Sequence, residues 1–395
     1  MATFLVLLLA YTLSQFFRSF LAVIAPELAH ELGLSPADLG NMSAIWFLAF
    51  ALAQLFVGWS LDRVGPRRTM SGLMLLAVVG ALVLASAQGR AGCLAGMALI
   101  GIGCSPIYMG SLFLFGRTHD KAKFALMSSL LLGFGSLGNL LGATPLAVAS
   151  QWLGWRPTFV IIAAATAVSA GLIGLLLRDP ERLEPETQGQ GPLSGLRQIL
   201  ALRDLWPMLP ITLISYAVLL AERGLWVGPF FTDVFGLQPV ARGNAVLVMA
   251  IAMSAGAFLY APADSLGLDR KWLVVAGSSL TAGLFILLAA LGAESMGLAI
   301  VILALAGAAG MTYVQLIAHA RQFFPEALLG RGISTMNLLY FGGAGLLQPL
   351  SGFVVGALKA RGQTPAEIYG GLHLMFGLLL AAATAVYLGS RRSPG

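Results

Sequence analysis

Apolar segments of similar length alternate with short polar stretches along almost the whole chain. A helix needs about 20 apolar residues to cross a bilayer. Twelve segments meet this length: 3–26, 40–61, 69–88, 92–115, 124–148, 156–177, 206–231, 244–262, 272–292, 296–318, 332–357 and 367–389. The pattern therefore predicts an all-α polytopic membrane protein with twelve transmembrane helices.

The composition points the same way. Hydrophobic residues make up 58% of the 395 residues and charged residues only 10%, whereas an ordinary soluble protein has about 25% charged residues. A water-exposed globular protein is thereby excluded. The 48 glycines suit a membrane protein, in which small residues let packed helices approach closely. Met1 lies almost at the first segment without a basic region before it, so we expect no cleaved signal peptide.

Positive charges lie mainly on one side of the predicted membrane. Sixteen of the 23 Lys and Arg residues fall in the loops after even-numbered segments or near the C-terminus, and five fall in the opposite loops. Because positively charged loops stay in the cytoplasm, we expect both termini to be cytoplasmic and the protein to lie in the plasma (inner) membrane. The net charge of +6 then reflects topology, and we expect no nucleic-acid partner.

The two halves of the chain repeat each other at an offset near 203 residues. The segment Gly33–Asn41 is similar to Gly236–Asn244, and Asp62–Gly65 is similar to Asp264–Gly267. Each half contains six spans, so both copies enter the membrane in the same sense and form parallel repeats. We expect a six-helix bundle over 1–178, a flexible linker over 179–204 and a second six-helix bundle over 205–395.

The loop after the second span carries the most specific motif, Gly58-Trp-Ser-Leu-Asp-Arg-Val-Gly-Pro-Arg-Arg68. With this motif and the six-plus-six repeat, the chain resembles the major facilitator superfamily over essentially its whole length. The resemblance implies that family's fold and alternating access by rocking of the two bundles. It also implies a conformational latch that stabilises the outward-open state, formed by Gly58, Asp62, Arg63, Gly65, Arg67 and Arg68.

A carboxylate beside three arginines can form charge-assisted hydrogen bonds, which is the physical basis of such a latch. The second copy has Tyr260 where the first has Gly58, so we expect a weaker latch there. The alternative is that this loop is basic only to fix topology.

Two arginines lie inside predicted spans, Arg18 in the first and Arg223 in the seventh. A charge at the bilayer centre costs at least about 2.5 kcal/mol, so such a residue is a functional candidate. Each arginine follows a tyrosine by seven residues, which places the pair on one face of a continuous helix. A second tyrosine pair, Tyr108 and Tyr313, repeats at the same offset on the fourth and tenth spans. The predicted substrate-binding residues are Tyr11, Ser14, Gln15, Arg18, Tyr108, Tyr216, Arg223 and Tyr313.

The resemblance implies that spans one, four, seven and ten line a central cavity near the membrane midplane. It places the two arginines on the helices from which organophosphate/phosphate antiporters present an arginine pair. Nitrate porters of the superfamily carry theirs on helices two and eight, where this chain has none. The alternative is that Arg18 and Arg223 extend to the membrane interface as anchors.

Apart from Glu367, the first residue of the last span, Glu222 is the only acidic residue inside a predicted span. It either carries a proton during transport or pairs with a charge on a neighbouring helix. His319 and His373 lie near span ends, and we expect structural roles for both. Met249 and Met253 form an i, i+4 pair, which suits Cu(I) binding or, as we expect, core packing.

The spans contain no nucleophile–base arrangement, paired carboxylates or phosphate-binding loop. We therefore expect no enzyme activity, no cofactor and no metal.

The sequence favours a secondary active transporter, a symporter or antiporter, of a small organic or phosphate-like anion. The alternatives are a drug or metabolite exporter and, with less support, a non-transporting receptor or assembly factor. We expect a monomer in the lipid bilayer. The substrate, the direction and the coupling ion, including whether protons drive transport, stay open.

Overall fold

The computed structural model describes residues 2–180, 197–260, 267–325 and 328–391. These residues contain helices and no strand. Eleven of the described helical stretches are long and apolar enough to cross a membrane, and a bent pair of helices at the N-terminus makes a twelfth when counted as one span. The predicted all-α polytopic membrane architecture is confirmed, because each expected apolar segment coincides with one of these stretches.

The chain divides into two compact units. The first unit consists of residues 1–34 and 45–190, and the second of residues 35–44 and 191–395. The start of the second predicted span thus belongs to the second unit by its contacts. The functional division into bundles over 1–178 and 205–395 stays a prediction.

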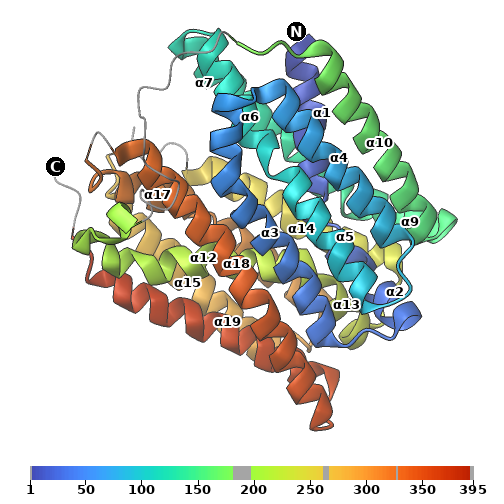
Figure 1. Cartoon of the computed structure of the whole chain (residues 1–395). Coiled ribbons are helices and arrows are strands. Elements are labelled where there is room, and N and C mark those ends of the chain that lie inside the picture. The colour runs from blue at the N-terminus through green and yellow to red at the C-terminus, as the bar shows by residue number, and fades with distance from the viewer. Residues whose placement is uncertain (1, 181–196, 261–266, 326–327, 392–395) are drawn as a thin grey trace. The chain divides into compact units, whose positions relative to one another are not determined.

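The first unit is built around α4, which packs along both α5 and α10 (Figure 1). A Cβ on Gly80 of α4 would lie 2.7 Å from the carbonyl oxygen of Gly96 on α5, so glycine is required where these two backbones touch. The helices that carry this unit are α1 (Ala2–Phe16), α2 (Leu21–Leu32), α3 (Pro36–Arg63), α4 (Pro66–Ala85), α5 (Arg90–Cys104), α6 (Pro106–Thr118), α7 (Lys121–Gly135), α8 (Leu137–Leu141), α9 (Thr144–Leu153) and α10 (Trp155–Leu176).

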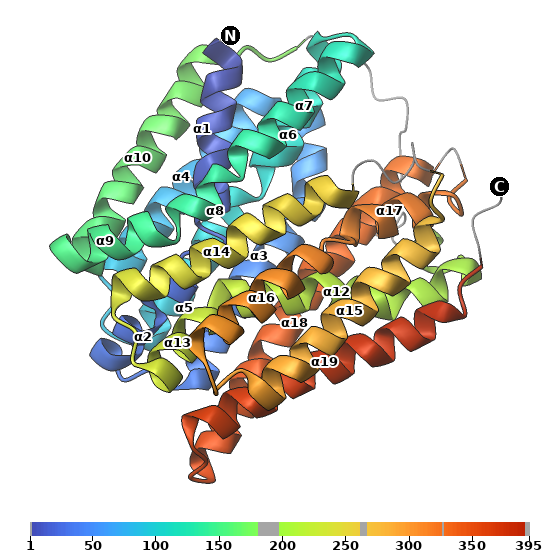
Figure 2. The ribbon, with the colours of Figure 1, turned by 180° about the vertical axis from the view of Figure 1, so that it is seen from behind.

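The second unit repeats this plan with α15 packed between α16 and α19 (Figure 2). Asp269 caps the start of α15, and Thr364 forms a capping box with Glu367 at the start of α19. Its elements are the 3₁₀-helix η1 (Arg203–Met208), α12 (Leu209–Ala221), the π-helix η2 (Glu222–Trp226), α13 (Val227–Phe235), α14 (Pro239–Tyr260), α15 (Arg270–Leu291), α16 (Met296–Ala309), α17 (Tyr313–Arg321), α18 (Leu329–Ala360) and α19 (Pro365–Leu388).

Five of the described spans contain a helix interruption, and four of these five carry candidate site residues. The first span is split into α1 and α2, the fourth into α5 and α6, and the tenth into α16 and α17. The seventh contains the π-helix η2 between α12 and α13. Interrupted membrane helices expose backbone groups and typically form transporter sites. All four spans that carry the tyrosine and arginine pairs are thus interrupted, and so is the fifth span, which is divided into α7, α8 and α9.

Candidate functional site

Arg18 lies in the break between α1 and α2, whose axes differ by 48°. The span predicted over 3–26 is therefore formed by two helices that meet at residues 17–20. No proline or glycine occupies the break. Instead, the Ser19 hydroxyl donates to the carbonyl oxygens of Gln15 and Phe16 at 3.4 and 3.3 Å. A serine that bonds the preceding turn of its own helix bends that helix.

The Arg18 guanidinium lies over two aromatic rings of α3. Its central carbon is 5.5 Å from the ring centroid of Trp46 and 5.1 Å from that of Phe50. The two rings are stacked, with centroids 5.2 Å apart and planes inclined by 12°. A guanidinium over aromatic faces is stabilised by their quadrupoles, and more strongly where water is excluded. Both rings are buried, so the first unit holds Arg18 in an aromatic setting.

Arg223 lies in the π-helix η2, and its side chain is 3% exposed. π-Helical turns occur frequently at functional sites. Its neighbour Glu222 is fully buried, and Glu222 Oε1 lies 3.3 Å from Nε2 of His373 on α19. The rings of Phe230 and Phe285 pack against His373. The second unit therefore places its arginine beside a buried carboxylate–imidazole pair in apolar surroundings.

The predicted tyrosine pairs are stacked within each unit. Tyr11 and Tyr108 have ring centroids 5.3 Å apart, and Tyr216 and Tyr313 have centroids 4.8 Å apart. In the second unit a third ring joins them, because Tyr340 donates its hydroxyl to the Tyr313 carbonyl at 3.2 Å. Each repeat thus brings its tyrosines together by direct ring contact.

The two remaining predicted residues of the first span have different neighbours. Ser14 is buried and forms a side-chain hydrogen bond with Cys104 of α5. Gln15 lies where α1 crosses α8, since a Cβ on Gly138 would come within 2.9 Å of the Gln15 Cβ. The side-chain amide oxygen Oε1 of Gln15 is buried without a hydrogen-bond partner among the described residues.

The signature segment is braced by the end of α10. Gly65 adopts φ +96°, and a Cβ there would lie 2.7 Å from Cγ of Asp179, so only glycine fits. The backbone N–H of Arg67 donates to Asp179 Oδ1 at 2.8 Å. The side-chain Nε of Arg67 donates to the carbonyl oxygen of Gly174. Arg63 lies over the ring of Trp59, and Arg68 is exposed.

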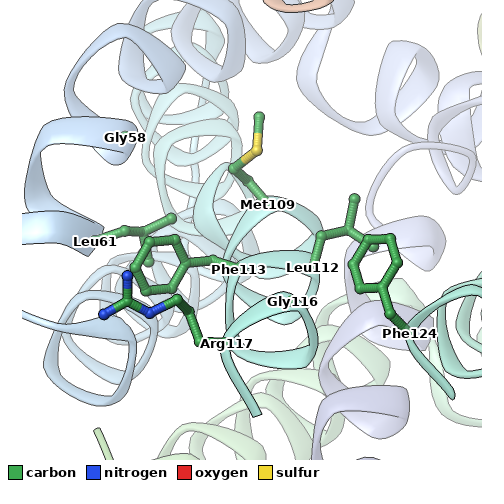
Figure 3. A pocket seen from close by; sticks show the side chains of 8 residues that line it. All are labelled: Gly58, Leu61, Met109, Leu112, Phe113, Gly116, Arg117 and Phe124. Atoms are coloured by element: carbon green, nitrogen blue, oxygen red, sulfur yellow. The ribbon is translucent and has the colours of Figure 1, made fainter. Parts of the chain in front are cut away.

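The side chain of Asp62 lies outside the described residues, so the proposed pairing of Asp62 with these arginines stays a prediction. A cavity of about 420 Å³ lies beside Gly58, between α3, α6 and α7 (Figure 3). Its lining is apolar except for Arg117, whose guanidinium lies over Phe113 at 5.8 Å.

The structure adds three buried polar groups to those that the sequence indicated. His373 lies 3.3 Å from Glu222, and its structural role stays a prediction. The indole N–H of Trp46 and the side-chain amide of Gln348 are buried without hydrogen-bond partners among the described residues. For Trp46 the internal repeat is a sequence signal. Trp46 and Phe50 lie 203 positions before Met249 and Met253, the i, i+4 pair of the eighth span.

Comparison with known proteins adds relatives that carry small molecules. The chain is 26% identical over 326 residues to a gentisate transporter of Corynebacterium glutamicum, covering 78% of this chain and 71% of the relative. It is 23% identical to a putative tartrate transporter of Agrobacterium vitis over 98% of this chain and 89% of the relative. The multidrug resistance protein MdtL of Klebsiella pneumoniae is 25% identical over 49% of this chain and 50% of its own length.

The fold is also that of solved transporter structures. A bacterial homologue of the human lysosomal transporter Spinster, in an inward-facing and occupied conformation, superimposes with a TM-score of 0.79 at 19% identity, covering 100% of this chain and 98% of that one. The sequence pattern of the Major Facilitator Superfamily matches residues 7–349. The twelve-span helical architecture, the interrupted helices and this match together establish that the chain is a membrane transporter that belongs to the Major Facilitator Superfamily.

Proposed function

We propose that this transporter carries a small organic anion by alternating access, with Arg18 and Arg223 binding its anionic groups. The observation that carries the proposal is the repeat of an arginine at a helix interruption, in the break after α1 and in η2. A guanidinium presents a planar fork that binds a carboxylate or phosphate through two hydrogen bonds. The low exposure of Arg223 argues against a role as an interface anchor.

The relatives support an organic anion as the substrate. Gentisate and tartrate are carboxylates, and the two relatives named for them align with most of this chain. The stacked tyrosine pairs, with Ser14 and Gln15, complete the proposed substrate-binding set on spans one, four, seven and ten. We propose that Gly58, Asp62, Arg63, Gly65, Arg67 and Arg68 form a latch between conformations. The protein then acts as a monomer with both termini in the cytoplasm.

Proton coupling is assigned to Glu222. The carboxylate is fully buried and its Oε2 has no hydrogen-bond partner among the described residues. His373 lies at 3.3 Å from the other oxygen, so one proton can be shared between the two side chains. A site that gains and loses a proton during transport links substrate movement to a pH gradient.

Uptake into proteoliposomes tests the proposal. Radiolabelled gentisate, tartrate and inorganic phosphate are offered under an imposed pH gradient, with wild type, Arg18→Ala and Arg223→Ala. We expect uptake of at least one organic anion by wild type and loss of that uptake in both variants. Unchanged uptake in both variants would overturn the assignment of the arginines.

Multidrug export is the second candidate. It is favoured by the match to MdtL and by the apolar cavity between α3, α6 and α7. An apolar cationic dye such as ethidium separates the two candidates in the same vesicles. Transport of ethidium without transport of any anion would establish the exporter and exclude the anion transporter.

A further inference from the structure

The indole N–H of Trp46 is a buried hydrogen-bond donor without an acceptor. Trp46 is 1% exposed, and its Nε1 has no hydrogen-bond partner among the described residues. Leaving such a donor unpaired is unfavourable, and buried polar groups in native proteins are nearly always paired. The position of Trp46 therefore calls for an acceptor that the described residues do not supply.

The backbone at Trp46 is held firmly in place. A Cβ on Gly101 of α5 would lie 2.4 Å from the Trp46 carbonyl oxygen, so α3 and α5 touch at this point. On its own helix the indole is stacked with Phe50 and packed edge-on against Phe47. A ring fixed on these sides cannot readily turn its N–H toward another partner.

The acceptor that fits this position is an oxygen of an anion. The Arg18 guanidinium lies 5.5 Å from the indole centroid, so a group bound at Arg18 comes within reach of the ring edge. Aromatic faces carry negative partial charge and aromatic edges positive partial charge. An anion therefore avoids the stacked faces and is attracted to the edge that bears the N–H.

The second unit lacks this arrangement. At the positions 203 residues later, Trp46 and Phe50 are replaced by Met249 and Met253. Both methionines are buried and contact Gly307 of α16. A thioether donates no hydrogen bond. At this repeat position an indole donor is thus present in the first unit, and a methionine replaces it in the second.

We propose that Trp46 and Arg18 together bind one carboxylate of the substrate, with the indole N–H as a specificity-determining donor. This inference rests on the proposed function and names the anionic group that the first unit selects. A carboxylate is planar, matches the guanidinium fork and carries one charge. A phosphate dianion beside a single arginine in an apolar pocket would leave one negative charge uncompensated.

The test compares Trp46→Phe with wild type, using gentisate, benzoate and inorganic phosphate as probes. Phenylalanine keeps an aromatic face for Arg18 and removes only the N–H. Affinities are measured by calorimetry on the full chain in nanodiscs. We expect Trp46→Phe to weaken binding of the carboxylates about tenfold, the change for about 1.4 kcal/mol, and phosphate to bind weakly to both proteins. The matched control is Trp152→Phe, since Trp152 is 82% exposed in the same unit.

A spectroscopic measurement separates a direct hydrogen bond from an indirect effect. In ¹⁵N-tryptophan-labelled protein, the indole resonance missing from Trp46→Phe is that of Trp46, and it should shift on addition of the carboxylate. Carboxylate binding with equal affinity in Trp46→Phe and an unmoved resonance would overturn the inference and assign the N–H to water, while the proposed function would stand. No binding of any carboxylate by wild type would overturn both.

Discussion

The two units place an arginine at equivalent positions but surround it differently. In the first unit Arg18 lies in a helix break, over the rings of Trp46 and Phe50. In the second unit Arg223 lies in a π-helix, next to the buried pair of Glu222 and His373. The repeat has kept the charge and the irregular backbone around it. The aromatic rings beside the first arginine are replaced by a buried carboxylate–imidazole pair beside the second.

In the proposed mechanism, this difference gives the two units different roles. Aromatic rings keep their charge distribution at any pH, so the Arg18 site is suited to recognising a fixed anion. A carboxylate and an imidazole change charge when a proton moves, so the surroundings of Arg223 are suited to coupling. Parallel repeats with different neighbours thus let one transporter combine recognition and energy coupling.

The same contrast recurs at the ends of the bundles. In the first unit, Trp155 and Arg156 both donate to the Glu31 carboxylate, the latter at 2.9 Å. In the second, Tyr369 donates to Asp233 at 2.6 Å. Both contacts tie the end of a unit's first span to the start of its sixth. The position of the contact is repeated, while a neutral and a charged donor in the first unit are replaced by one neutral donor in the second.

The largest expected effect is the loss of substrate binding in Arg18→Ala and in Arg223→Ala. Removing one partner of a buried charged hydrogen bond costs about 2–5 kcal/mol, so affinity should fall at least thirtyfold in each variant. The lysine variants keep the charge but lose the fork and should keep partial function. Equilibrium binding of radiolabelled substrate measures the change. Arg90→Ala and Arg361→Ala, at exposed positions, should bind as wild type, and thirtyfold losses there would point to a general electrostatic effect.

Glu222→Gln should uncouple transport from the pH gradient and leave substrate exchange intact. Glutamine cannot release a proton, whereas exchange of substrate for substrate requires no net proton movement. Accumulation and exchange are measured in the same proteoliposomes. His373→Gln should also impair accumulation, because the proton then lacks its second site. Full proton-driven accumulation in Glu222→Gln would remove this pair from the mechanism and leave it as a structural contact.

Lys271→Ala should destabilise the protein more than Asp179→Ala. The Lys271 ammonium is buried and donates to the carbonyl oxygens of Leu388 and Ser390 at 2.8 and 2.5 Å, whereas Asp179 is exposed. Hydrogen bonds to a charged group contribute about 1.5–3 kcal/mol to stability, so unfolding of Lys271→Ala should need correspondingly less denaturant. Both variants are compared by their unfolding midpoints in detergent. A larger loss in Asp179→Ala would reverse the order that burial predicts.

The smallest expected effect on binding is that of Asp62→Asn. The proposed latch biases two conformations and does not touch the substrate, so equilibrium affinity should stay within about twofold while turnover slows. Binding and initial transport rate are measured on the same preparation. A large loss of affinity at unchanged turnover would be incompatible with a latch.

The sequence by itself determined the architecture and the family. Apolar segments of spanning length admit only one regular structure in lipid, because an α-helix satisfies its backbone hydrogen bonds within the segment. The offset that relates Tyr11 to Tyr216 and Arg18 to Arg223 was visible without coordinates. These features depend on local pattern and on residue spacing, both of which the sequence carries directly.

The environment of each arginine was decided by tertiary structure. The helix break at Arg18 contains neither proline nor glycine. Its Ser19 is not a specific signal, because Ser111 and Ser254 form similar hydrogen bonds within continuous helices. The pairing of Glu222 with His373 joins residues 151 positions apart, and the unpaired N–H of Trp46 depends on what packs around it. Such contacts depend on where two helices cross. The crossing point is set by small residues, such as Gly101 of α5, which packs directly against the backbone of α3 at Trp46. Sequence spacing located the charges, and only packing determined which neighbours they received.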